Sequence, residues 1–514
     1  MSPRPERLPQ GAPLYPSHSM RPRGAQLQPQ AAVRRPLKVF KFGGTSVGDA
    51  LSIARVVDIV RTSVLASDVV VVVSAMSGVT NKLLDAASQS AEGDRHSVAA
   101  TFRELRERHE EAAKSLIESV HARRVTLVRL REVLDEGERL CGDVLARRQL
   151  TLRETDAISG LGERLSAPLV AAALAAAGVD SEAIETTELV VTDGNHGGAE
   201  PFIDLTRERC EIRVRPLLLQ GIVPVVTGFI GATREGALTT LGRNSSDFSG
   251  TIVGAALNAD EVVLWTDVDG ILSADPRLVP TARPIPQMSY QEASDLADSG
   301  AKVLHSKTLR PVMQRGITLT IRNTFAPDRP GTRIAPVGSF TAVEMRALAA
   351  AKNRSLITVR GSSRITTSEI LTRSLAVVGA ELPLILPSFS SRHEVSFVVS
   401  SSQGDHVLQA LRSELALELA NRCIGEVTLQ PGVSVITVVG YQAKGASRRL
   451  SRLVRALNGQ NLSVLASVAS PAGSSIRLVV ADEDMQAALV AVHDEFHRQS
   501  ASEPRSLEPP IKRS

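Results

Sequence analysis

Aromatic and sulfur-containing side chains are scarce in this sequence. Only 3% of its 514 residues are aromatic, with one tryptophan and three tyrosines, and there are three cysteines. The hydrophobic cores must therefore be built from Val, Leu, Ile and Ala. Cys141, Cys210 and Cys423 are far apart and lack the spacing of a metal-binding motif, and an odd number argues against a disulfide framework. We expect three packed thiols, no metal site and a cytoplasmic protein.

Long apolar runs and a strong charge of one sign are also missing. The longest apolar runs, 69–73 and 169–176, are far shorter than the roughly 18 residues that span a bilayer. The formal net charge is +4, but residues 1–36 hold six arginines and one glutamate, which leaves the rest of the chain nearly neutral. A near-neutral body is a poor match for the phosphates of nucleic acid. We therefore expect neither a membrane nor a nucleic acid as a partner.

The two ends of the chain differ from the part between them. Residues 1–36 are rich in Pro, Arg and Gln and hold no continuous apolar segment of the kind that a secretory signal needs. Residues 500–514 are charged and have no helix or strand pattern. Both ends are predicted to be disordered tails. The length of the chain is enough for about three domains.

Strand and helix patterns alternate over residues 37–335. Apolar, often β-branched runs predict strands at 37–42, 69–73, 189–192, 223–227, 261–266 and 317–321. Helical periodicity lies between them, and 95–150 is predicted to be a helical insertion. This alternation predicts an α/β domain with a mostly parallel sheet and helices on both faces. Farther on, the order β, α, β, β, α, β occurs over 343–427 and again over 428–499, which predicts two ferredoxin-like units.

The segment Lys41-Phe42-Gly43-Gly44-Thr45-Ser46 follows the first predicted strand. Glycines allow a phosphate to approach the backbone, and amides at the start of a helix favour an anion. Lys41 can neutralise charge on a transferring phosphoryl group. Because the lysine precedes the glycines, the segment is not the P-loop GxxxxGK[ST]. Taken alone, it is equally consistent with a strand-end lysine and a tight turn.

Five further segments place small, polar and charged residues at the ends of predicted elements. They are SAMSGVTN at 74–81, GERLS at 162–166, TTLGRNSSD at 239–247, WTDVDGILSADPR at 265–277 and GAKVLH at 300–305. In a parallel sheet, the loops after the strands gather at the carboxyl edge, where ligands bind. Arg243 can hold a carboxylate in a bidentate fork, and Lys302 offers a second phosphate contact. Glu163 taken alone is most simply a helix N-terminal charge.

In this combination and order, the segments resemble the aspartokinases of the amino-acid kinase superfamily, over about residues 37–499. KFGGTSV together with TTLGR..SD is the most specific part of the resemblance. Residues 343–499 resemble the paired ACT domains that sense amino acids in these enzymes. The segments MSYQEA and NTFAPDRPGT are most similar to the kinase half of the bifunctional aspartokinase–homoserine dehydrogenases. No dehydrogenase fingerprint G-x-G-x-x-G follows a strand in this sequence.

The resemblance implies transfer of the γ-phosphoryl group of MgATP to the side-chain carboxylate of L-aspartate, giving 4-phospho-L-aspartate for lysine, threonine and methionine biosynthesis. A carboxylate is already nucleophilic, so positioning and charge neutralisation suffice without a general base. The site residues that the resemblance implies are Lys41 and Asp247 for catalysis, Thr45, Ser74, Glu163, Arg243 and Ser246 for aspartate, and Lys41, Gly43, Gly44, Thr266, Asp267, Arg277 and Lys302 for ATP. It also implies ATP and Mg²⁺ as cofactors and a homo-oligomer formed through the ACT units.

The sequence departs from the family pattern at several positions. Ser245 stands where the family usually has glycine, and its Cβ would cost affinity if φ is positive. His196 replaces a common aromatic residue, Leu272 replaces an aromatic on the adenine side, and Ser306 replaces a proline. None of these changes removes a charged catalytic group, so we expect activity.

The ACT segments depart further. Strand segments 387–391 and 466–470 both lack a glutamine that is usual there. This departure argues against binding of a lysine or threonine effector in the usual way. We expect feedback inhibition to be weakened or altered, with the ACT units kept for dimerisation.

Two alternatives stay open. The first is another amino-acid kinase, acting on glutamate or acetylglutamate; the motifs around Arg243 and Glu163 and the ACT pair argue against it. The second is a non-catalytic ACT regulatory protein with an inactive kinase fold. The presence of Lys41, Arg243 and Asp247 argues against that alternative.

Overall fold

The computed structural model describes residues 34–242, 245–300, 304–336, 345–378, 384–387, 393–440, 446–470 and 473–500. The predicted tails span 1–36 and 500–514, and all of their residues except 34–36 and Ser500 lie outside the described residues; Ser500 is the last residue of a helix, α16 (Met485–Ser500). None of the described helices combines the length and the apolar character that a membrane span requires.

The first part of the described chain builds an eight-stranded sheet in the order β3-β4-β2-β1-β7-β9-β10-β8. Its strands are β1 (Leu37–Phe42), β2 (Asp68–Val73), β3 (Ser181–Ile184), β4 (Val223–Thr227), β7 (Glu261–Thr266), β8 (Gln287–Ser289), β9 (Thr318–Asn323) and β10 (Thr332–Ala335). Every neighbouring pair is parallel except β9 with β10. The predicted mostly parallel sheet is therefore confirmed. A separate hairpin joins β5 (Ile230–Ala232) to β6 (Leu238–Thr240).

The central strands are buried on both faces. In β1, Phe40 and Phe42 belong to one hydrophobic core, while Leu37 and Val39 belong to the other. Successive side chains of a strand point to opposite faces, so a strand covered on both sides needs apolar residues at nearly every position. The five consecutive valines of β2 meet the same requirement.

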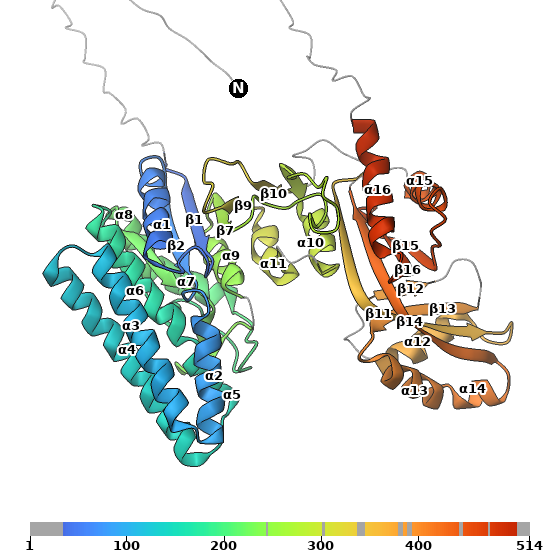
Figure 1. Cartoon of the computed structure of the whole chain (residues 1–514), viewed down its shortest axis with the longest axis horizontal. Helices are drawn as coiled ribbons and strands as arrows, with labels where there is room; N and C mark the ends of the chain where they lie inside the picture. Colours follow the sequence, from blue (N-terminus) through green and yellow to red (C-terminus); the bar gives the residue numbers. More distant parts are fainter. Residues whose placement is uncertain are drawn as a thin grey trace, which may run out of the picture. The chain divides into compact units, whose positions relative to one another are not determined.

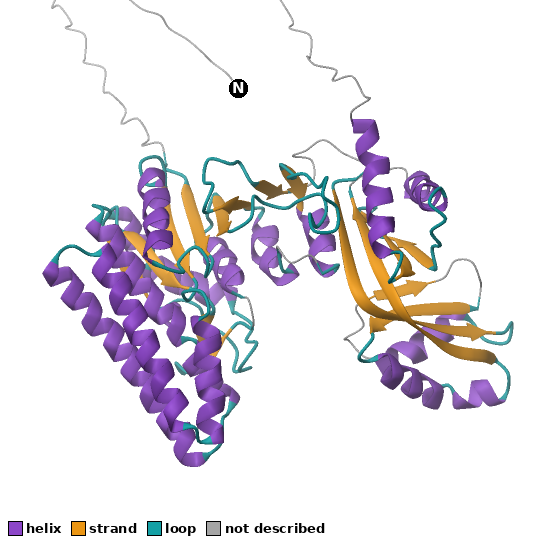
Figure 2. Cartoon of the chain, viewed as in Figure 1, coloured by secondary structure: helices purple, strands orange, loops and turns teal. Residues whose placement is uncertain are grey.

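Helices cover both faces of this sheet (Figure 2). On the face of Phe40 lie α1 (Ala50–Ser63), α2 (Val79–Glu92), α3 (Arg95–Leu116), α4 (Val120–Arg147), α5 (Leu152–Ser159) and α6 (Leu161–Ala176). On the opposite face lie α7 (Ile203–Arg213), α8 (Arg215–Leu219), α9 (Ser246–Ala256), α10 (Tyr290–Asp298) and α11 (Ser306–Arg315). Helices α3 and α4 lie side by side and form the helical insertion expected at 95–150 (Figure 1). A single turn of 3-10 helix, η1, spans Thr186–Glu188.

The strand expected at 189–192 is wrong. Val191 and Thr192 make only isolated bridges, to Ala232 and Pro201, and the strand that pairs with β4 is β3. Leu189, Val190 and Val191 are nevertheless fully buried, because this segment packs beside the β5–β6 hairpin rather than in the sheet. An apolar run indicates that a segment is buried, but a short buried connection has the same sequence pattern as a buried strand.

The C-terminal part forms a six-stranded antiparallel sheet in the order β12-β13-β11-β14-β16-β15. Its strands are β11 (Ala347–Gly361), β12 (Leu384–Pro387), β13 (Glu394–Ser400), β14 (Ile424–Val439), β15 (Ala466–Ala469) and β16 (Ser475–Ala481). Its helices are α12 (Thr367–Val378), α13 (Gly404–Glu414), α14 (Ala416–Ala420), α15 (Ala446–Asn458) and α16 (Met485–Ser500).

The two longest strands, β11 and β14, run side by side through this sheet (Figure 2). The first half of β11 pairs with the end of β14, and its second half pairs with β13 and with the start of β14. Each long strand therefore contributes to both halves of the sheet. The unit boundary between 427 and 428 falls inside β14 and stays a prediction.

The loop that follows β7 is packed into the C-terminal core. Ala274 and Val279 of this loop belong to the same buried cluster as Leu489 of α16. Ser273 Oγ lies 2.9 Å from His493 Nε2, and both side chains are buried. The conformation of this loop therefore depends on a helix that lies more than 200 residues later in the chain.

Replacing His493 tests this connection. We expect His493→Leu to lower the free energy of unfolding by about 1–3 kcal/mol, because it leaves the buried Ser273 hydroxyl without its ring partner. Urea denaturation followed by circular dichroism measures the change. His406 of α13 is exposed, so His406→Leu serves as the control and should change stability by less than about 0.5 kcal/mol. Equal effects of the two substitutions would contradict the connection.

Candidate functional site

Four loops meet at the carboxyl edge of the parallel sheet. Phe42, at the end of β1, is in register with Val73 of β2 and with Trp265 of β7, and Val73 is in register with Thr227 of β4. The loops stay joined just beyond the strands: Gly43 N donates to the Trp265 carbonyl at 3.1 Å, and Gly228 N donates to the Val73 carbonyl at 2.8 Å. This edge is where parallel sheets bind ligands.

The glycine loop after β1 lies close to its neighbours. A Cβ on Gly44 would lie 3.1 Å from the carbonyl oxygen of Ala75, so a larger residue would crowd the loop after β2. Ser46 anchors the loop, with its Oγ 2.7 Å from Thr324 Oγ1, whereas Thr45 is exposed. The loop is thus tied down at Ser46 and open to solvent at Thr45.

Lys41 is a buried cation at this edge. Its side chain is 8% exposed, and its Nζ lies 2.5 Å from Asp247 Oδ1 in the first turn of α9. Gly250 makes the approach possible, because a Cβ there would lie only 2.9 Å from Lys41 Cβ. The Asp247 side chain is 30% exposed. The pair therefore places a cation with little water around it next to a carboxylate that a ligand can reach.

Glu163 is a fully buried carboxyl group on α6 beside the same loops. Its Oε1 accepts a hydrogen bond from Ala75 N at 3.0 Å, while its Oε2 has no hydrogen-bond partner among the described residues. Burial raises the pKa of Glu163 to about 8, although the Ala75 N–H and the nearby Lys41 ammonium act in the opposite direction. A buried carboxyl oxygen without a donor suits a ligand that brings one.

The end of β7 adds polar groups beside the glycine loop. Thr266 is half-buried and Asp267 is exposed, and the Thr266 hydroxyl donates to Asp267 Oδ1 at 3.2 Å. Trp265, just before them, stacks on Phe42 with ring centroids 5.9 Å apart. The stacked rings brace the two strand ends from which these polar loops begin.

An apolar cavity of about 380 Å³ lies beyond β7. Leu272, Ala293 and Leu296 line it together with Leu348 and Leu489 of the C-terminal part. Asp275 and Arg277 also line it; their ion pair measures 2.6 Å, and the Arg277 side chain is 70% exposed. Leu272 is therefore a wall of an apolar hollow and not part of the polar cluster around Lys41.

The expected site residues do not all lie in one place. The carboxyl edge of β1, β2, β4 and β7 holds most of them, on strand ends, loops or helix starts: Lys41, Gly43, Gly44, Thr45, Ser74, Glu163, Ser246, Asp247, Thr266 and Asp267. Arg277 lies farther along the loop after β7, and Arg243 and Lys302 lie outside the described residues.

Ser245 does not carry the strain that a serine at a glycine position would suffer at positive φ. Its φ is −90°, in the range open to any residue. Its hydroxyl donates to the Gly242 carbonyl at 2.6 Å and closes the turn before α9. The positive φ belongs to Gly242, at +96°.

Sequence reasoning missed Asp156, a buried carboxylate of α5 that accepts hydrogen bonds from two other segments. The available signal was its spacing, one helical turn before the buried residues Ser159 and Gly160. An acidic residue in a short helix is usually exposed, so this signal alone is weak.

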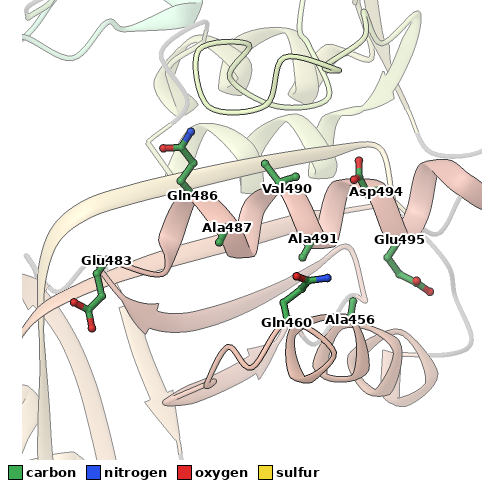
Figure 3. A pocket seen from close by; sticks show the side chains of 9 residues that line it. All are labelled: Ala456, Gln460, Glu483, Gln486, Ala487, Val490, Ala491, Asp494 and Glu495. Carbon is green, nitrogen blue, oxygen red and sulfur yellow. The ribbon is translucent and has the colours of Figure 1, made fainter.

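A second hollow, of about 620 Å³, opens between α15 and α16 (Figure 3). Ala456, Ala487 and Ala491 lie between the two helices, and Glu483 and Asp494 bring carboxylates. No lysine or arginine is among its lining residues. It is therefore a poor site for a phosphate.

Comparison with known proteins identifies relatives. Residues 36–323 match the amino acid kinase family. The bifunctional aspartokinase/homoserine dehydrogenase 1 of Arabidopsis thaliana is 30% identical over 476 residues, which cover 89% of this chain and 51% of that protein. Aspartokinase 1 of the same plant is 29% identical, with 89% and 80% covered. The chain thus spans about half the length of the bifunctional relatives that it matches first.

A solved structure is similar over nearly the whole chain. It is that of E. coli aspartokinase III in complex with aspartate and ADP, with a TM-score of 0.72 and 26% sequence identity. The match covers 90% of this chain and 100% of that one. It therefore includes the parallel sheet and the C-terminal antiparallel sheet together.

Proposed function

The chain belongs to the amino acid kinase family, and we propose that it is an aspartate kinase, which transfers the γ-phosphoryl group of MgATP to the side-chain carboxylate of L-aspartate. A carboxylate oxygen forms the new bond to phosphorus, the bond to the β–γ bridging oxygen breaks, and 4-phospho-L-aspartate and ADP leave. The observation that carries the proposal is the grouping at one sheet edge of Lys41, Asp247 and Glu163, whose Oε2 has no partner among the described residues. This product would serve lysine, threonine and methionine biosynthesis.

The residues have separate roles in this proposal. Lys41 stabilises the charge of the transferring phosphoryl group, because a cation shielded from water acts strongly on nearby charge. Asp247 holds Lys41 in place. Gly43 and Gly44 let the phosphates approach the backbone, and Thr266, Asp267, Arg277 and Lys302 contact the nucleotide.

The amino-acid substrate would lie between Glu163 and the loop before α9. Glu163 Oε2 accepts a hydrogen bond from the substrate ammonium, and Arg243 holds the α-carboxylate. Thr45, Ser74 and Ser246 line the same pocket. The glutamate and acetylglutamate alternatives would place a longer or an acylated substrate here.

Magnesium would arrive as the MgATP substrate. Mg²⁺ prefers oxygen ligands and is usually held by one or two carboxylates together with the phosphates. Asp247 and Asp267 are carboxylates at the open side of this edge, so the residues present fit the ion. Among the described residues, no group of three or more His, Cys, Asp or Glu side chains forms a metal site of its own.

The assay for this function is detection of the acyl phosphate. Incubation of the purified full chain with ATP, Mg²⁺, aspartate and hydroxylamine should give aspartyl hydroxamate, and a panel with glutamate and acetylglutamate should give less than about a hundredth of the rate. The absence of hydroxamate from all three acids would favour the non-catalytic regulatory alternative. The proposal includes a cytoplasmic location, which suits three free cysteines.

Feedback control is the part of the proposal in which we expect this chain to differ most from the family, because both ACT strand segments lack the usual glutamine. The first segment that lacks the usual glutamine continues beyond Pro387 outside the described residues, and the second forms β15. We expect L-lysine, L-threonine or both to inhibit only at millimolar concentration, while the C-terminal units join copies of the chain into a homo-oligomer. Inhibition curves with each amino acid measure this. Strong inhibition at micromolar concentration would contradict it.

A further inference from the structure

Asp156 is a buried carboxylate that the proposed phosphoryl transfer does not use. Its side chain is 2% exposed, and it lies on α5, outside the sheet edge that carries Lys41. Its oxygens accept hydrogen bonds from His196 Nδ1 at 2.9 Å, from Gly197 N at 3.0 and 3.1 Å, and from Thr240 Oγ1 at 2.5 Å. One side chain therefore holds both the loop at 193–201 and the end of β6.

Both segments that Asp156 joins contribute residues to the lining of one cavity. This cavity has a volume of about 240 Å³, with Gly197 and Gly198 on the loop side and Gly242 and Ser245 on the side of β6. The walls are close: a Cβ on Gly242 would lie 3.7 Å from the Gly197 carbonyl oxygen.

Other bonds tie the two segments together but do not reach α5. Ala199 N donates to the Thr240 carbonyl at 2.9 Å, and the hydroxyls of Thr192 and Thr239 lie 2.6 Å apart. Asp193 Oδ1 accepts hydrogen bonds from Asn195 N and Glu200 N, both at 3.1 Å, and these two bonds stay within the loop. Of the hydrogen bonds named in this subsection, only those of Asp156 connect the 193–201 loop and the end of β6 to α5. Glu163 lies on α6, the next helix along the chain.

We propose that Asp156 is a positioning residue for the amino-acid substrate. It keeps the 193–201 loop and the end of β6 at a fixed distance from α6, so that the part of the cavity lined by Gly197 and Gly242 stays in place relative to Glu163, the group proposed to hold the substrate ammonium. This inference rests on the proposed function. Displacement of a group that binds the substrate weakens ground-state and transition-state binding alike, which raises the KM and leaves kcat nearly unchanged.

His196, which stands where the family commonly has another aromatic residue, is one of the donors to Asp156. The ring donates through Nδ1 to Asp156, which a phenyl ring at this position cannot do. The histidine that departs from the family pattern is thus one of the groups that satisfy the buried carboxylate. Replacing His196 by a residue that has an N–H donor, and by one that has a ring but no donor, distinguishes the effect of the hydrogen bond from the effect of the ring.

The main variant is Asp156→Asn in the full chain. The amide has nearly the same size, but it has one acceptor oxygen instead of two and turns an N–H₂ group toward donors. We expect the KM for aspartate to rise about 10- to 50-fold, with kcat and the KM for MgATP within about twofold of the wild type. Asp193→Asn is the matched control on the same loop, and we expect its KM for aspartate to change less than about threefold.

Milder variants keep the test informative if Asp156→Asn does not fold. Thr240→Val removes one donor without a change of shape, and we expect the KM for aspartate to rise about 3- to 10-fold. His196→Asn keeps an N–H donor and should stay within about threefold, whereas His196→Phe should raise the KM as Thr240→Val does. Equal effects of Asn and Phe at position 196 would overturn the hydrogen-bonding role.

Amide hydrogen exchange without substrate separates this inference from the proposed function. We expect Asp156→Asn to speed exchange at Gly197 and Ala199 at least tenfold, whether or not the protein phosphorylates aspartate. Unchanged exchange would overturn the positioning role, and so would an increase of both KM values together with a loss of kcat. Failure of the wild type to form hydroxamate would instead refute the proposed function while the exchange result still stands.

Discussion

Lys41→Ala should lower kcat about 10³-fold and leave the KM for aspartate within about threefold. Lys41 is the buried cation at the sheet edge, and removal of a single group that stabilises transition-state charge typically costs 10²- to 10³-fold in rate. Cations that act on a transferring phosphoryl group can contribute more. Steady-state kinetics with a coupled ADP assay measure both constants, and residual rates are confirmed by hydroxamate.

Lys38 supplies a matched control on the same strand. It lies at the other end of β1, is about one-third exposed, and pairs with Glu261 at 3.1 Å. Lys38→Ala should change kcat less than about twofold, since the lost ion pair is partly solvated. Lys41→Arg keeps the charge but not the compact ammonium group and should fall between wild type and Lys41→Ala. A kcat for Lys41→Ala within tenfold of the wild type would refute the role of this lysine.

Glu163→Gln should raise the KM for aspartate about 10- to 100-fold with a smaller effect on the KM for MgATP. The amide oxygen can still accept from Ala75 N, so the local structure is kept, but the negative charge opposite the substrate ammonium is lost. Hydrogen bonds to charged groups contribute about 1.5–3 kcal/mol, which corresponds to this range. Glu292, another buried glutamate, is the control: its partner is Arg346, so Glu292→Gln should lower stability and leave the KM for aspartate unchanged.

The raised pKa of Glu163 gives the same prediction a pH signature. With a pKa of about 8, the free carboxyl group is mostly protonated at pH 6–7, whereas an ammonium ligand requires the carboxylate. Substrate binding therefore releases a proton, and kcat/KM for aspartate should rise up to tenfold per pH unit until about pH 8 and then level off. This slope should disappear in Glu163→Gln. A flat wild-type profile between pH 6 and 8 would show that the ammonium is held elsewhere.

Much of the fold follows from local patterns in the sequence. The runs at 37–42 and 69–73 predict strands because apolar residues at every position suit a strand covered on both faces, and both strands are where the pattern places them. The run at 189–192 carries the same signal and is not a strand, since burial alone does not determine hydrogen-bond partners. The motif order also predicts which loops meet at the carboxyl edge.

The alternation of strands and helices, the glycine loop after Lys41 and the resemblance to a kinase family can all be predicted from the sequence, because they depend on neighbours within a few positions. Three other features appear only in the folded chain: Glu163 keeps one oxygen without a partner among the described residues, Lys41 pairs with Asp247, and Asp156 joins two distant segments. These contacts link residues 40 to more than 200 positions apart, and they depend on how helices pack on the sheet. Spacing in the sequence carries no record of such distances.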